Sequence, residues 1–94
     1  MQPQYEWDED KAKVNPHKHQ VSFQEGVTVF NDPLIATQPD PDHSLDEQRY
    51  IVVGRSVRGR VLVVVFTERG DMIRLISCRK ATPRERRVYE EDNL

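Results

Sequence analysis

The stretch Val61-Leu62-Val63-Val64-Val65-Phe66 decides the fold of this chain, because every side chain in it is apolar. Successive side chains of a strand point to opposite faces, so a strand with one face in water alternates apolar and polar residues. This segment does not alternate, and its β-branched valines favour an extended backbone. We therefore expect a central strand that is covered, or nearly covered, on both faces.

Two more strands are expected beside it, over Tyr50–Ser56 and Met72–Lys80, and the central strand itself extends to Thr67. Glycine-containing turns separate the three strands, and connections this short force antiparallel neighbours. In the last strand, a two-residue period divides the side chains between two faces. One face would hold Arg74, Ile76, Cys78 and Lys80, and the other Ile73, Leu75, Ser77 and Arg79.

Capping signals predict two helices before the sheet. Asp8 is a helix cap, and Pro16 is expected to end or kink the helix that follows, because proline disfavours helical geometry in the residue before it. Ser22 and Glu25 form a capping box, which starts a second helix over about Phe23–Asn31.

Between these helices and the sheet, Leu34–Thr37 is expected to form a short edge strand, and Gln38–Glu47 an exposed, mobile loop. After the sheet, Thr82 and Glu85 form another capping box around Pro83, so a last helix should run to about Glu90. The expected fold class is α+β: two N-terminal helices, an antiparallel sheet of three to four strands and one C-terminal helix.

The chain has 94 residues, which predicts a single small domain over 1–94. Its apolar content of 36% is lean beside 32% charged residues, so we expect a thin core and a surface completed in part by a partner. No apolar stretch is long enough to span a membrane, and the acidic N-terminus lacks the features of a signal peptide. The expected location is the cytoplasm. Cys78 lies in an apolar run and is interpreted as a small core residue.

Charge is distributed unevenly along the chain. Residues 49–87 hold eleven basic and three acidic side chains, a net +8, while 1–48 carry −7 and 88–94 carry −3. Ten of the eleven basic residues are arginine, whose planar fork matches phosphate oxygens. An anionic polymer is therefore one expected partner. The alternative is a solvated sheet whose arginines pair with the acidic flanks.

Arg79 has two possible roles. It lies next to the start of the last helix, where backbone N–H groups attract phosphate, so it could clamp a phosphate. It could equally pair with Glu85 or with the acidic residues at the C-terminus. Both interpretations remain open from the sequence.

The histidines suggest proton transfer more than metal binding. His17 and His19 are two residues apart, which puts them on different sides of a helix, so no metal site is predicted. Attack of an RNA 2′-hydroxyl on the adjacent phosphate needs a base and a neutralising cation but no metal. Candidate bases are His19, His43 and Glu47. No phosphate-binding glycine loop or nucleophile elbow occurs, so no cofactor is predicted.

Several segments, in order and spacing over about residues 5–90, resemble the BrnT family of bacterial toxins. They are Glu6-Trp7-Asp8, Lys11-Ala12, Asn15, Lys18-His19, Val21-Ser22-Phe23, Phe30-Asn31-Asp32-Pro33, Glu47-Gln48-Arg49-Tyr50, Gly54, Ile73-Arg74-Leu75-Ile76-Ser77-Cys78-Arg79-Lys80-Ala81, Glu85-Arg86 and Tyr89. The resemblance implies a RelE-like fold and a metal-independent endoribonuclease that inhibits translation. It also implies a BrnA-like antitoxin encoded beside the toxin, through which alone the complex would contact operator DNA.

The resemblance, together with the residue chemistry, gives a set of candidate site residues. The expected catalytic residues are Arg79, Arg49, Glu47 and His19. The expected RNA-contacting residues are Lys11, Lys18, Arg74, Lys80, Arg84 and Arg87.

Two other function classes remain open from the sequence. The chain could bind nucleic acid through the same basic sheet without cutting it, with a strong dependence on salt. It could also be an interaction module whose arginines match an acidic protein surface.

Overall fold

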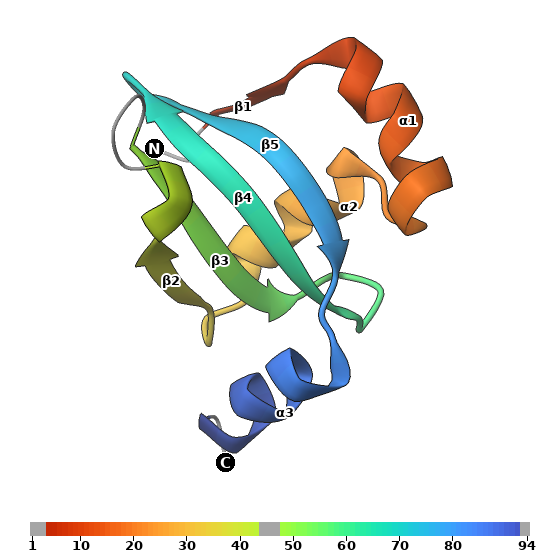
Figure 1. Cartoon of the computed structure of the whole chain (residues 1–94), viewed down its shortest axis with the longest axis vertical. Helices are drawn as coiled ribbons and strands as arrows, with labels where there is room; N and C mark the ends of the chain where they lie inside the picture. The colour runs from red at the N-terminus through yellow and green to blue at the C-terminus, as the bar shows by residue number, and fades with distance from the viewer. Residues whose placement is uncertain (1–3, 44–47, 93–94) are drawn as a thin grey trace.

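A five-stranded sheet organises the molecule (Figure 1). The computed structural model describes residues 4–43 and 48–92, with the side chain of His43 outside the description. The strand order is β1-β5-β4-β3-β2, so β4 is central as predicted. The bounds are β1 Gln4–Trp7, β2 Ala36–Pro39, β3 Arg49–Arg55, β4 Val61–Arg69 and β5 Met72–Lys80.

The prediction of a purely antiparallel sheet of three to four strands was wrong in two respects, because the sheet has a fifth strand, β1, and that strand is parallel to its neighbour. β1 pairs in parallel with β5, from Gln4 opposite Met72 to Trp7 opposite Leu75, and makes the sheet mixed. Antiparallel neighbours are revealed by the turns that join them, whereas a parallel pair needs a long connection and leaves no local signal. The α+β class itself is confirmed.

A bulge in β5 also corrects the predicted division of its side chains. Val65 and Phe66 are adjacent in β4, but their partners are Ser77 and Leu75, so Ile76 is the extra residue. A bulge shifts the alternation by one residue. Leu75 and Cys78 are therefore both buried in the core. Arg74 and Arg79, predicted on opposite faces, share the other face of the sheet through their partners Thr67 and Val63.

The helices are α1 Glu9–His19, α2 Phe23–Thr28, continued by the 3₁₀ turn η1 Val29–Asn31, and α3 Pro83–Asp92. All three predicted N-caps are confirmed, with Asp8, Ser22 and Thr82 side chains accepting backbone N–H groups. The capping box predicted for Ser22 and Glu25 is only half formed, because the Glu25 carboxylate bonds Arg60 and Ser56 instead. The expected early end at Pro16 was wrong, because α1 continues to His19. Hydrogen bonds from Asn15 to the carbonyls of Val21 and Cys78, and from Lys80 to Gln20, hold the end of the helix in place. These contacts outweigh the tendency of proline to end a helix.

One face of the sheet is covered by helices and forms the core. Phe23 and Val29 of the α2–η1 segment pack there against Leu62, Val64 and Leu75. Cys78 is fully buried there, as predicted, and burial raises the pKa of its thiol to about 12. We call the opposite side the open face; among the described elements only α3 approaches it, at one end (Figure 1).

The remaining predicted boundaries moved by one to two residues. The edge strand occupies Ala36–Pro39 rather than Leu34–Thr37, and the last helix extends to Asp92. The predicted loop over Gln38–Glu47 begins with the end of β2 and the 3₁₀ turn η2 (Pro41–His43), and residues 44–47 lie outside the described residues. No helix in the described ranges is long and apolar enough to cross a membrane.

Candidate nucleic-acid interface

A groove of about 370 Å³ lies where the ends of α1 and β5 meet the start of α3. We call it the junction groove. The sequence-predicted residues Lys18, His19, Arg79 and Lys80 all line it, although α1 and β5 are far apart in the chain. Its complete lining is His17, Lys18, His19, Gln20, Arg79, Lys80 and Thr82. Three permanent cations and two histidines thus surround one concave surface.

Asn15 fixes the end of α1 against β5. Its buried amide nitrogen donates to the carbonyl oxygens of Val21 at 2.7 Å and Cys78 at 2.8 Å. Gln20 then ends the helix in the left-handed conformation, and its side-chain oxygen accepts a hydrogen bond from Lys80 Nζ at 2.8 Å. These contacts place His19 beside the end of β5.

A second groove continues from the junction groove along α1. Lys18 and His19 line both, and Lys11 lines the second together with Asn15 and Ile76. Ile76, the extra residue of the β5 bulge, therefore forms part of the lining of this second groove. We call the surface formed by Lys11, Lys18, His19, Arg79 and Lys80 the basic track. Lys11 and Lys18 are seven residues apart on α1, so they lie on the same side of the helix.

Arg79 is paired with Glu85 in a bidentate ion pair. The two Nη–Oε distances are 2.7 and 2.9 Å, and Glu85 also accepts the backbone N–H of Thr82. The hydrogen bonds from Arg79 are the main reason that the pKa of Glu85 falls to about 2, and the same contact raises the pKa of Arg79. Pairing with Glu85 is thus confirmed. Arg79 remains 41% exposed and still lines the junction groove.

The capping box at the start of α3 limits what that helix end can bind. The N–H of Thr82 donates to Glu85, and the N–H of Glu85 donates to the Thr82 hydroxyl. Two backbone donors that could have contacted a phosphate are therefore already used. Phosphate binding at the junction groove would depend mainly on side-chain cations.

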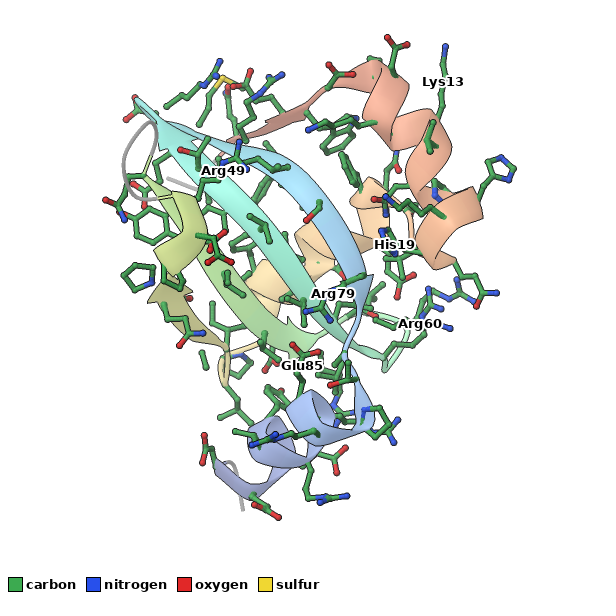
Figure 2. The ribbon with its side chains drawn as sticks, in the orientation of Figure 1. Lys13, His19, Arg49, Arg60, Arg79 and Glu85 are labelled. Atoms are coloured by element: carbon green, nitrogen blue, oxygen red, sulfur yellow. The ribbon has the colours of Figure 1, made fainter. Side chains whose placement is uncertain are left out.

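Arg49 and Arg74 lie at the other end of the open face. Both are partners of Thr67 in the sheet register, so they flank it on neighbouring strands. Val53 of β3 pairs with Val63 of β4, which pairs in turn with Arg79 of β5. Because Arg49 is four residues from Val53 on β3, Arg49 and Arg79 are separated by roughly 13 Å along the strand direction. Figure 2 shows Arg49 and Arg79 at different ends of the sheet. The structure does not bring these two predicted catalytic arginines together.

The remaining candidates are dispersed. Arg74 Nη1 is 3.7 Å from Glu6, Arg84 lines a different groove beside α3, and Arg87 is exposed on that helix. Glu47 and the side chain of His43 lie outside the described residues. Within the described ranges, no three metal-ligating side chains come together.

The buried Glu25 cluster was not predicted from the sequence. Glu25 accepts hydrogen bonds from Arg60 and from Ser56 Oγ, the latter at 2.7 Å, and the Arg60 bond is the main cause that lowers its pKa. Arg60 also donates to the backbone oxygen of Gln20. This arginine therefore ties the β3–β4 turn to α2 and to the end of α1. Glu25 and Arg60 are 35 residues apart in the chain, so no short sequence motif indicates their contact.

The fold is a small α+β domain, and the basic track gathers cations from α1 and β5 on its surface. The fold is similar to the crystal structure of the Brucella abortus ribonuclease toxin BrnT, with a TM-score of 0.62 and 23% identity, over 86% of this chain and 99% of that one. No curated protein sequence matches the chain.

Residues 7–85 match the family described as the ribonuclease toxin BrnT of type II toxin-antitoxin systems. The chain therefore belongs to the BrnT toxin family, as the sequence resemblance indicated. Membership of this family implies an antitoxin partner and an RNA target.

Proposed function

We propose that this chain is a metal-independent endoribonuclease that inhibits translation and cuts RNA at the junction groove. The observation that carries the proposal is the convergence of His19, Lys18, Arg79 and Lys80 around one groove. The proposed location is the cytoplasm, where messenger RNA is translated. A BrnA-like antitoxin would hold the enzyme inactive, and operator DNA would be contacted only through that complex.

The proposed reaction is transfer of a phosphate ester within the RNA. The 2′-oxygen attacks the adjacent phosphorus, the bond from phosphorus to the 5′-oxygen breaks, and a 2′,3′-cyclic phosphate and a 5′-hydroxyl result. His19 accepts the 2′-hydroxyl proton, and a proton is returned to the leaving oxygen. Arg79 and Lys80 stabilise the additional negative charge on the phosphate in the transition state.

The residues outside the junction groove have supporting roles in this proposal. Lys11 and Lys18 would bind phosphates of the RNA on one side of the cut, along the basic track. Arg49 and Arg74, at the far end of the open face, and Arg84 and Arg87 on α3 would contact more distant phosphates. Glu47 is the second proposed proton-transfer residue.

Cleavage of a defined RNA by the purified protein tests the proposal, with a chelator present throughout. Wild type should produce fragments with cyclic phosphate ends, and His19→Ala should be slower by about 10²–10⁴-fold. Arg79→Ala should not cut the RNA detectably. Glu85→Gln is the matched control, because it breaks the same ion pair but keeps the guanidinium, and it should still cut.

Equal losses in Arg79→Ala and Glu85→Gln would show that the ion pair is needed only for folding. Binding that depends on salt, with no cleavage by wild type, would instead support the non-catalytic alternative.

A further inference from the structure

We infer that the antitoxin docks in the groove between α3 and the open face, through a segment that carries aliphatic side chains beside a carboxylate. We call this the α3 groove. The inference rests on the proposed toxin function, and it adds the surface that the partner occupies and the chemistry that it needs.

The α3 groove has a volume of about 400 Å³, and aliphatic side chains line it beside polar and charged ones. Ala36, Ile51 and Val53 of β2 and β3 contribute from the sheet, and Val88 contributes from α3. Val88 is 52% exposed, and Ala36 belongs to an edge strand in which all four residues are exposed. Apolar groups that are gathered in a concave surface and left in water are typical of a binding site.

The lining fits a peptide better than RNA. Proteins that bind single-stranded RNA stack its bases on aromatic side chains. Six of the seven aromatic residues of this chain pack in or against the core on the covered face: Tyr5, Trp7, Phe23, Phe30, Tyr50 and Phe66. The seventh, Tyr89, lines the groove but is only 6% exposed, with its hydroxyl bonded to Asp32. Aliphatic side chains of a protein partner match the remaining surface.

The charges at the groove indicate where the carboxylate of the partner lies. The groove is lined by Arg79 near the end of β5, by Arg84 in the first turn of α3 and by Asp92 at the end of α3. Glu85 is engaged by Arg79, whereas Arg84 has no ion-pair partner in the part of the chain that the structure describes. An acidic side chain of the partner would therefore be placed beside Arg84.

The position of Arg79 connects docking to inhibition. Its side chain lines both the α3 groove and the junction groove, so it forms the wall between them. A partner seated in the α3 groove would sit against Arg79 and obstruct the approach of RNA to the proposed site. The antitoxin would not need to fill the junction groove to inactivate the enzyme.

Val88→Asp tests the inference, with Val14→Asp as its matched control. Both valines lie on helices and are similarly exposed, 52% and 56%, but Val14 is on α1 and away from the α3 groove. The probe is the purified protein encoded by the gene adjacent to this one. Val88→Asp should weaken its binding by about tenfold or more, because it places a carboxylate in the apolar groove. Val14→Asp should bind like wild type.

Arg84→Ala should also weaken the complex, and more strongly at low salt than at high salt. Val88→Asp should still cut RNA, but more antitoxin should be needed to inhibit this variant than to inhibit the wild type. Unchanged antitoxin binding by Val88→Asp, or no binding by wild type, would overturn the inference. Weaker RNA binding with intact antitoxin binding would make the α3 groove an RNA surface instead. Because binding of the antitoxin is measured without RNA, this test of the docking surface is valid whether or not the wild type cuts RNA.

Discussion

Replacement of Glu85 by glutamine separates the charge of the Arg79–Glu85 pair from its geometry. Glutamine has nearly the same shape, and its amide oxygen can still accept the backbone N–H of Thr82, so the capping box is retained. What is lost is the negative charge opposite the guanidinium of Arg79. The variant therefore measures what this ion pair contributes to stability.

The pKa of Glu85 sets the size of the effect. It falls from 4.5 to about 2, and each unit corresponds to about 1.4 kcal/mol. Because the two side chains are 41% and 34% exposed, water screens the pair, and we expect Glu85→Gln to lose about 1–2 kcal/mol at pH 7.

The sign of the pH dependence follows from the lowered pKa. The folded-state pKa lies below that of the unfolded chain, so the stabilisation is complete above pH 4.5 and is lost as the pH falls towards 2. Urea unfolding of both proteins at several pH values between 7 and 3 measures this difference. The difference in stability between wild type and Glu85→Gln should shrink by more than half at about pH 3. Equal stabilities at pH 7, or a difference that does not change with pH, would refute the reasoning.

Three further substitutions test the packing, each by urea unfolding at pH 7. Gly26→Ala would place a Cβ 2.8 Å from Cys78 Sγ and should cost about 1–3 kcal/mol, part of which Cys78→Ala should restore; additive effects would contradict this contact. Asn15→Ala leaves two buried carbonyls without their donor and should cost about 2–4 kcal/mol; a loss below 1 kcal/mol would show that water replaces the amide. Arg60→Ala strips the buried Glu25 of its main partner and should cost about 3 kcal/mol; a loss below 1 kcal/mol would show that the remaining partners of Glu25, Ser56 and Arg58, are sufficient.

The parts of the fold that depend on local signals could be predicted. Asp8, Ser22 and Thr82 cap their helices because each interaction spans only two or three residues. The apolar run that begins at Val61 identified the central strand because burial on both faces removes alternation. Errors arose where distant segments decide the outcome, as when Asn15 bonds to Cys78, 63 residues away, in a helix that continues through Pro16.

The candidate site could be predicted in part. Arg79 and His19 were both expected, but nothing in their spacing shows that α1 and β5 bring them to one groove. The ion pair with Glu85 was one of two interpretations, and only the structure shows that it forms. Arg49 was expected to act with Arg79, but the register of the sheet separates the two.

Mapping of RNA 5′ ends in bacteria, minutes after controlled induction, tests the central claim most directly. We predict that wild type creates new, sequence-biased ends, that these disappear in Arg79→Ala, and that they persist in Glu85→Gln, which lacks the same ion pair. An unchanged profile of RNA ends after induction of the wild-type protein would contradict the account.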